Sequence, residues 1–425
     1  MVEQTFRAYL QMEENNQPLV DALARYRSMK QLRRSRAFLE HHDVLRDLFN
    51  RPRTYLDKSA TPRLGSFLRV AAWNIECGKS FDGIVHSLNS DPVLRFADLI
   101  LLSEVDDGMA RSGNRSVAAE LGRAIGAHAI YGIEYLELHG QGGGGDSANT
   151  AALHGNAILT RRPFSSPRLI RLPRCERNFE SAQKRLGGRL GLVIEVVMDT
   201  DPGTVKLLAA TTHLDVVNAP RCRQKQMRSL LDYLDSASKG PAILGGDLNT
   251  HTFSRGSRIQ SLRNLARLLL NPEGVTRSLL SPHQFEPVLQ DLGLFEFDLQ
   301  GFNDELHTCR VDDSQLLQSS DLPGPLKELV RRRFGARARS LDFRLDWLAG
   351  RQVRPLKQGE MVDAGSGARS ISPTTIARLE YKGLPVSDHS PIVADVAVTT
   401  ENRPRIGASP SAYSNDRLEV SATRW

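Results

Sequence analysis

Short apolar runs that end in polar side chains recur through the central part of the chain. The clearest begins with Ala242 to Leu244, continues through two glycines and ends with Asp247 and Asn249. Because side chains alternate along extended backbone, Asp247 and Asn249 would face the same side if the strand geometry continues through them. A carboxylate and a carboxamide at the end of a buried strand cost stability unless they bind something. This stretch therefore predicts a core strand that ends at a functional site.

The residues before this strand alternate between strand-like and helix-like patterns. Four consecutive segments are predicted as strand, helix, strand and helix: residues 68–76, 84–96, 98–105 and 117–125. The first strand ends in Asn74 and the second in Glu104. Alternation of this kind predicts an α/β domain.

Further strands bring more polar residues to their ends. The next predicted elements are a short strand, a hairpin around Asp201-Pro202-Gly203 and a helix: residues 155–160, 189–198 with 205–214, and 227–234. The hairpin places His213 at the end of its second strand. The apolar pattern returns at residues 341–348, which contain Asp346, and at residues 386–396, where Asp388 and His389 precede the last strand.

The chain divides into three predicted parts. Residues 1–66 form a helical extension, residues 67–399 a main domain with a variable insert at 251–340, and residues 400–425 a disordered tail. From Ala22 to Leu39 the extension has no acid and six basic residues: Arg25, Arg27, Lys30, Arg33, Arg34 and Arg36. Such a run fits either a helix that binds phosphate or membrane surfaces, or a face that is solvated.

Composition narrows the class of protein. With 40% hydrophobic and 25% charged residues in 425, the chain is typical of soluble globular proteins. Its formal charge of +7 is compatible with phosphate-bearing partners. Residues 1–20 lack the apolar segment of a secretory signal, and no apolar run is long enough to span a membrane. The four cysteines are scattered along the chain, at positions 77, 175, 222 and 309, which predicts reduced thiols and a cytoplasmic location.

The polar strand ends are more informative together than singly. Eight residues lie at or beside such ends: Asn74, Glu104, His213, Asp247, Asn249, Asp346, Asp388 and His389. Each alone is explained by a turn or a structural histidine, whereas an ordinary core would have to place four carboxylates and two imidazoles there by accident. Carboxylate and amide oxygens suit Mg²⁺ or Mn²⁺, and no cysteine cluster competes for zinc. The set predicts one site for metal-assisted phosphoester hydrolysis.

The order of these motifs resembles that of the endonuclease/exonuclease/phosphatase superfamily. The superfamily includes pancreatic-type deoxyribonucleases, apurinic endonucleases, neutral sphingomyelinases and inositol polyphosphate phosphatases. The resemblance covers roughly residues 68–398 and rests on seven motifs: Asn74-Ile-Glu76, Ser103-Glu-Val105, Gly155-Asn-Ala-Ile-Leu159, Thr212-His-Leu214, Gly246-Asp-Leu-Asn249, Leu345-Asp-Trp347 and Ser387-Asp-His-Ser-Pro391. It implies a four-layer α/β/β/α sandwich of two packed mixed sheets, with the site at the strand ends.

The resemblance also implies a metal site. Glu104 would hold a divalent ion, Mg²⁺ or Mn²⁺, with Asn74 alongside and Asp388 in the shell of the metal. The residue before Glu104 is often Gln in relatives and is Ser103 here, which leaves the ligand intact but would loosen its surroundings.

Five further residues would act on the substrate or on water. By the resemblance, Asp247 would orient or deprotonate the nucleophilic water and Asn249 would bind a phosphate oxygen. His389 would contact the phosphoryl group or act as the base, and Asp346 would fix its tautomer, a pairing that also makes sense unaided. His213 would stabilise the phosphate or the leaving oxygen. The choice of general base between Asp247 and His389 stays open.

Three functions remain at this point. The first is a phosphodiesterase acting on nucleic acid, supported by the basic balance and by Lys184, Arg185 and Arg189. The second is a hydrolase of lipid or small-molecule phosphoesters, for which Phe295 and Phe297 could form an apolar contact surface. The third is a binding module without turnover, which would have no need to keep the acid, amide and imidazole set.

Overall fold

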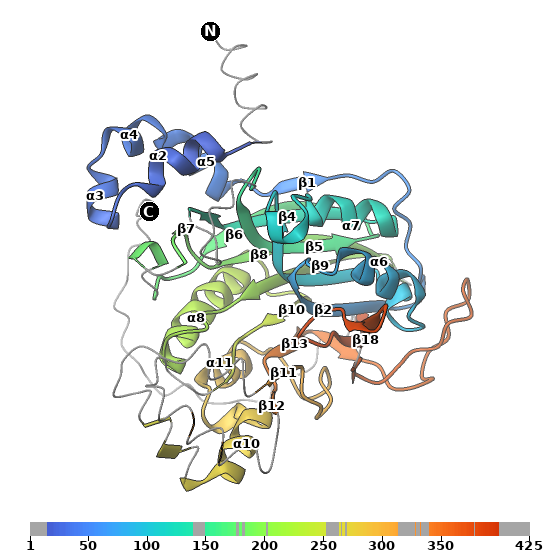
Figure 1. The fold of residues 1–425 in the computed structure, drawn as a ribbon. Coiled ribbons are helices and arrows are strands. Elements are labelled where there is room, and N and C mark those ends of the chain that lie inside the picture. The colour runs from blue at the N-terminus through green and yellow to red at the C-terminus, as the bar shows by residue number, and fades with distance from the viewer. Residues whose placement is uncertain are drawn as a thin grey trace.

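The computed structural model describes most of the chain outside the two termini and parts of the insert. The described residues are 15–138, 149–175, 178–180, 183–200, 203–251, 263–264, 266–267, 270–312, 328, 332, 340–377 and 379–398. The predicted tail at 400–425 lies outside them. Figure 1 shows two sheets packed against each other, with helices on the outer faces and a separate group of helices near the N-terminus.

The first sheet is mixed and has the strand order β1-β4-β5-β3-β2-β18-β14, with β7 paired to β4 and β15 paired to β18. Its strands are β1 Arg53–Tyr55, β2 Leu68–Cys77, β3 Leu99–Asp107, β4 His128–Glu137, β5 Leu153–Thr160, β7 Arg185–Gly187, β14 Val353–Pro355, β15 Thr374–Thr375 and β18 Ile392–Val398. Among the described pairs of this sheet, β2 and β3 run parallel and the others antiparallel.

The second sheet has the order β13-β10-β9-β8-β6. Its strands are β6 Phe164–Arg171, β8 Leu190–Thr200, β9 Gly203–His213, β10 Ala242–Asp247 and β13 Asp346–Arg351. β10 is parallel to β9 and antiparallel to β13. Two short ladders stand apart from the two sheets, β11 Cys309–Asp312 with β12 Ser340–Phe343 and β16 Glu380–Tyr381 with β17 Leu384–Pro385.

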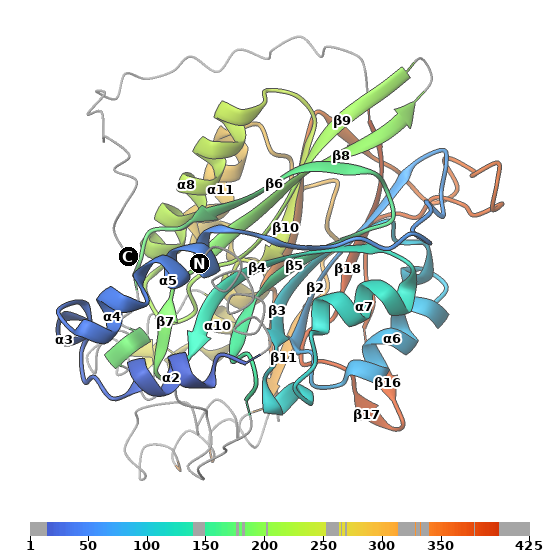
Figure 2. The ribbon, with the colours of Figure 1, turned by 90° about the horizontal axis from the view of Figure 1, so that it is seen from above.

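The layers follow from which face of each sheet is apolar. Leu101 and Ile158 of the first sheet pack with Leu192 and Ile243 of the second in one buried cluster, so the inner faces meet. The outer face of the first sheet packs on α6 Phe81–Ser90 and α7 Val117–Ile125, and the outer face of the second on α8 Pro220–Ala237 and α11 Pro287–Leu294 (Figure 2). The predicted α/β/β/α sandwich of two mixed sheets is confirmed.

The N-terminal helices form a group of their own. They are α2 Gln17–Ala24, α3 Met29–Arg33, α4 Arg36–Glu40 and α5 His42–Asn50. Ser28 and Ser35 cap α3 and α4, since their hydroxyls accept hydrogen bonds from Gln31 N and Phe38 N. The six basic residues between positions 25 and 36 are all exposed. The segment predicted as helical also contains β1, whose pairing with β4 makes residues 53–55 part of the main sheet.

Most predicted elements occur with shifted ends, and the exceptions have local causes. The run at residues 341–348 was predicted as one strand, but it breaks into β12 and β13 because Arg344 and Leu345 leave the ladder and bond to Leu279 O and to the Thr308 hydroxyl. β4 and β6 were not predicted. Within the insert, α10 Pro272–Leu280 and α11 each begin with proline, which suits the first turn of a helix.

The thiol prediction was wrong for two of the four cysteines. Cys175 and Cys222 form a disulfide, with their Cα atoms 6.2 Å apart although they are 47 positions apart in sequence. Spacing along the chain did not reveal this pair because the fold brings α8 beside the segment after β6. Cys77 and Cys309 are free and buried. Among the described residues, no helix is both long and apolar enough to cross a membrane.

A buried ion pair joins the two strands that carry opposite ends of the candidate site. Arg69 of β2 donates from Nε and Nη2 to the two carboxylate oxygens of Asp395 of β18, both at 2.7 Å, and both side chains are almost fully buried. Removing one member leaves the other charge buried without its partner.

We therefore expect Asp395→Ala to lower the free energy of unfolding by about 3–5 kcal/mol, measured by denaturant titration. Arg36→Ala is the control, because the ion pair of Arg36 in the described part of the chain is with Glu40 on an exposed helix face, and its loss should leave the midpoint unchanged. A small effect of Asp395→Ala would show that the pair contributes little beyond its own desolvation.

Candidate active site

The ends of five strands and two adjoining loops gather the predicted site residues. Asp247 ends β10, and the sheet register sets it opposite His213 of β9 on one side and Asp346 of β13 on the other. Two glycines make this close packing feasible. A side chain at Gly245 would meet Leu101 of the facing sheet at 2.9 Å. Gly246 has φ +139°, and a Cβ there would lie 2.1 Å from Thr212 O.

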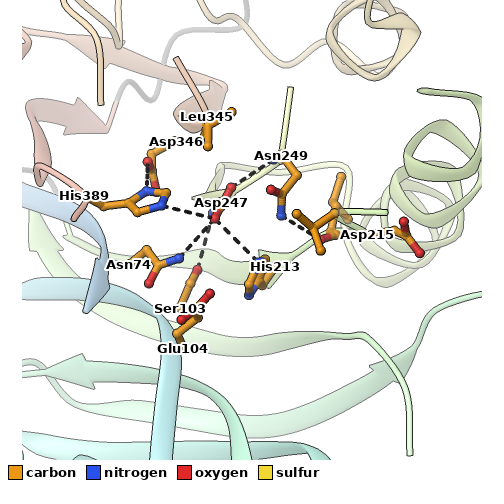
Figure 3. Close-up of polar contacts among 12 residues, drawn as sticks. Asn74, Ser103, Glu104, His213, Asp215, Asp247, Asn249, Leu345, Asp346 and His389 are labelled. Atoms are coloured by element: carbon orange, nitrogen blue, oxygen red, sulfur yellow. Dashed lines mark hydrogen bonds and ion pairs between the residues drawn. The ribbon is translucent and has the colours of Figure 1, made fainter. Parts of the chain in front are cut away.

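Asp247 lies at the centre of the contacts drawn in Figure 3. Its Oδ2 accepts a hydrogen bond from Asn74 Nδ2 at 3.1 Å and lies 3.5 Å from His213 Nε2 and 3.9 Å from His389 Nε2. Its Oδ1 accepts from the backbone N–H of Asn249 at 2.9 Å. Burial, with the nearby Asp346 carboxylate, raises the pKa of Asp247 to about 7.

His389 and Asp346 form the buried pair that the motif order predicted. His389 Nδ1 lies 2.7 Å from Asp346 Oδ2. Thr308 holds the backbone that carries this carboxylate, because its hydroxyl accepts from the backbone N–H groups of Leu345 and Asp346 at 3.0 Å. Burial alone would lower the pKa of His389, but the Cys309 thiol and the Asp346 carboxylate beside it hold that pKa well above the ordinary value. His389 Nε2 is thereby turned toward Asp247.

Glu104 lies on the other side of Asn74. It sits where the register between β3 and β5 shifts, with φ +53°, and such a bulge re-aims a side chain. Burial would raise the pKa of Glu104, but the charges of His154 and His389 and a hydrogen bond from Asn74 lower it. Asp388 is exposed, yet removal of its carboxyl group from water raises its pKa, and Glu104 adds to the rise.

The carboxylate oxygens at this site fit a hard divalent ion. Asp247, Asp346 and His389 each offer a ligand atom, and these atoms lie within 4.8 Å of one another. Asp346 Oδ1 is buried and has no hydrogen-bond partner among the described residues, as expected of an oxygen that awaits a cation. This group lies on the Asp247 side, whereas the sequence placed the metal at Asn74, Glu104 and Asp388. Asn74 joins the two sides because its side chain bonds to both Asp247 and Glu104.

The two remaining predicted residues line the same centre. His213 is buried, and burial with the nearby Arg189 charge lowers its pKa well below the ordinary value, so its imidazole is neutral. Its Nδ1 has no hydrogen-bond partner among the described residues. Asn249 has φ +51° and donates from Nδ2 to Leu214 O at 2.9 Å. That bond leaves the Asn249 side-chain oxygen as the group available to a ligand.

Sequence reasoning missed several residues that support this centre. Ser103 was expected to loosen the surroundings of the site, but its buried hydroxyl accepts a hydrogen bond from Asp247 N at 3.3 Å and so ties β3 to β10. Thr308 and Cys309 come from the insert, where no motif marks them. Cys77 was set aside as one scattered thiol, although it directly follows the motif Asn74-Ile-Glu76.

The structure removes two arguments that the sequence offered for particular substrates. Arg185 and Arg189 pair with Glu137 and Glu134, both at 2.9 Å, and Lys184 donates to backbone oxygens at the end of α2. These three cations make contacts within the protein and do not form an open surface for nucleic acid. Phe297 is buried, and Phe295 packs on the same cluster, so neither forms an exposed apolar surface for lipid.

A comparison with protein families identifies the class. The Endonuclease/Exonuclease/phosphatase family matches residues 71–389. The chain therefore belongs to this family, and its membership supports a phosphoester hydrolase. A comparison with curated proteins gives no match.

Solved structures similar to this chain come from several organisms. An endonuclease/exonuclease/phosphatase from Beutenbergia cavernae is 18% identical, with 78% of this chain and 72% of that chain covered and a TM-score of 0.44. The catalytic domain of human Nocturnin is 14% identical, with 82% and 97% covered and a TM-score of 0.44. TDP2 from D. rerio, complexed with a single-strand DNA product, is 16% identical, with 78% and 99% covered and a TM-score of 0.39.

Proposed function

We propose that this protein is a phosphodiesterase that hydrolyses its substrate with the help of Mg²⁺ or Mn²⁺. The observation that carries the proposal is the buried position of Asp247 between His213 and the His389–Asp346 pair. Two carboxylates and two imidazoles so close together repel or desolvate one another. Such an arrangement is expected where a cation and a phosphate anion complete the site.

The residues divide the work by charge. Glu104, Asn74 and Asp388, with oxygens of Asp247 and Asp346 nearby, would hold the ion, which supplies charge neutralisation at the phosphate when it is bound. Asp247 is our candidate general base, because a carboxyl group with a pKa of about 7 can take a proton near neutral pH. His389, kept protonated by Asp346, would bind a phosphate oxygen. Asn249 and the neutral His213 would position the phosphate and the leaving oxygen.

The first test is metal dependence on a minimal substrate. We expect the purified protein to hydrolyse a generic aryl phosphodiester with Mg²⁺ or Mn²⁺, and we expect a chelator to abolish turnover until metal is restored, because the carboxylates cannot neutralise the phosphate themselves. The rate is measured from the released phenolate. Chelator-resistant or absent turnover would exclude the metal-dependent enzyme.

A nucleic acid is the substrate class that we favour. The six basic residues of α2 to α4 and of the turns between them are all exposed, and one of them, Arg36, pairs with Glu40 of its own helix. The start of α2 is anchored near the start of β5, because Asn16 donates to Thr150 O and Ala151 O. This surface could bind phosphates on either side of the scissile bond.

We expect a variant with Arg27, Arg33 and Arg34 all changed to Gln to bind duplex or single-stranded DNA more weakly. If all three contact phosphates, the slope of log affinity against log salt should fall by up to about 2.7 for duplex DNA, measured by fluorescence anisotropy. Hydrolysis of the aryl phosphodiester should stay unchanged. The control replaces the exposed Arg123 and Arg168. A panel of plasmid, abasic duplex, RNA, sphingomyelin and inositol phosphates tests the class itself, and detergent-dependent lipid turnover would contradict our choice.

The cytoplasm stays the location that we propose. The Cys175–Cys222 disulfide favours an oxidising compartment instead, because disulfides are less common in the cytoplasm. Fractionation of the producing cells, followed by detection of the protein, decides between the two.

A further inference from the structure

Beside Glu104, three other side chains are buried together. Cys77, Asp106 and His154 are each less than 8% exposed, and their side-chain ligand atoms lie within 4.8 Å of one another. Asp106 and His154 face each other across β3 and β5, and His154 Nδ1 lies 2.8 Å from Asp106 Oδ1. The proposed function uses none of these three residues.

Arg111 holds the Asp106 carboxylate of this group in place. Arg111 donates from Nε and Nη2 to the two oxygens of Asp106, at 2.7 and 2.8 Å. His154 is further restrained by the ring of Tyr135, which stacks on it at 6.4 Å between ring centres. Because both oxygens of Asp106 are held by Arg111, we do not assign a second metal to this group. A carboxylate held in this way orients the histidine that bonds to it.

The group is connected to Glu104. The Cys77 thiol donates to Glu104 Oε2 at 3.6 Å, and Cys77 itself has φ +65° at the end of β2. The ligand atoms of Asp106 and His154 lie within 4.8 Å of that thiol, so Cys77 connects the group to the Glu104 carboxylate. Glu104 is thus held by Asn74, which also bonds to Asp247, and by Cys77, whose thiol lies within the buried group of Asp106 and His154.

Burying this many charged groups has a cost in stability. An ionic group in a protein interior is often no more stabilising than well-packed apolar residues of similar size. Charged partners that surround a metal-binding carboxylate contribute to metal binding instead, because they fix its orientation and raise metal affinity. The position of the group at the bulge that turns Glu104 toward the site favours this second explanation.

We propose that Arg111, Asp106 and His154 act as a positioning relay that sets the Glu104 carboxylate for binding the divalent ion. His154 is a positioning residue in this relay, since it acts through Glu104 and not on the substrate. The inference rests on the proposed function, because it takes Glu104 as a metal ligand. It adds three residues that neither the motifs nor the tight donor set around Asp247 include.

The test compares His154→Ala, His154→Asn and Asp106→Asn in the full chain. The first readout is Mn²⁺ affinity by calorimetry, and the second is the Mn²⁺ concentration that gives half-maximal hydrolysis of an aryl phosphodiester. We expect His154→Ala to weaken Mn²⁺ binding about 10- to 100-fold, with turnover largely recovered at saturating Mn²⁺. We expect His154→Asn to recover part of the affinity, because its Nδ2 can donate to Asp106 much as Nδ1 does. His128→Ala, at the other end of the same sheet, is the control.

The outcomes separate this inference from the function on which it rests. A thermal melt of each variant identifies those that do not fold, and the milder His154→Asn keeps the test available if His154→Ala is unstable. If wild type binds Mn²⁺ and hydrolyses the diester while the folded variants keep normal Mn²⁺ affinity, the relay is wrong and the function stands. If wild type itself shows no metal-dependent hydrolysis, the proposed function fails first.

Discussion

Asp247→Asn is expected to reduce the rate of phosphodiester hydrolysis at least about 100-fold. Asparagine has nearly the same shape, so the bond from Asn249 N to the side-chain oxygen can persist. The substitution removes the negative charge that faces His213 and His389, and it removes the group whose pKa of about 7 suits proton transfer near neutral pH. The loss should fall on kcat more than on KM, because the proton is taken in the transition state.

The measurement is a steady-state rate at saturating Mn²⁺, beside a thermal melt. Removing a buried carboxylate next to Asp346 relieves repulsion, so the variant should be at least as stable as wild type. Asp232→Asn, on the exposed side of α8, controls for the loss of one carboxylate. A near-normal rate in a folded Asp247→Asn protein would move the chemistry to other residues.

How far the sequence predicts the fold depends on the element. Strands with continuous apolar runs and a polar end, such as β2, β3 and β10, are recognisable because burial on both faces leaves no alternation to interpret. β6 escapes recognition because it lies at the edge of its sheet and is only half buried, with Pro167 inside it. β1 is three residues long and is held by its pairing with β4, which no local pattern shows.

The residues of the candidate site also differ in how well the sequence predicts them. Residues at strand ends were predictable because a polar group after an apolar run stands out, and the register then brings Asp247 beside both His213 and Asp346. Residues that support them from loops were not. Thr308 reaches Asp346 from the insert, and Ser103 bonds to Asp247 through its hydroxyl, contacts that depend on distances in space. The disulfide between Cys175 and Cys222 was missed for the same reason.

His389→Ala is expected to reduce the rate by at least about 100-fold as well, but for a different physical reason. His389 has a raised pKa because Asp346 bonds to its Nδ1 at 2.7 Å, so it brings a positive charge to the site near neutral pH. Its removal leaves Asp346 buried with neither of its oxygens paired to a cation, and the phosphate loses one of its neutralising groups. Both effects weaken binding of the transition state.

Comparison with Asp346→Asn distinguishes a charge effect from a loss of shape. Asparagine at position 346 keeps a group that can accept a hydrogen bond from His389 Nδ1, but it no longer stabilises the imidazolium. The hydrolysis rate of Asp346→Asn should therefore fall between those of wild type and His389→Ala. His86→Ala, on the exposed face of α6, is the matched control for losing an imidazole. If Asp346→Asn is as active as wild type while His389→Ala is inactive, His389 works as a neutral group, and the base would then be His389 and not Asp247.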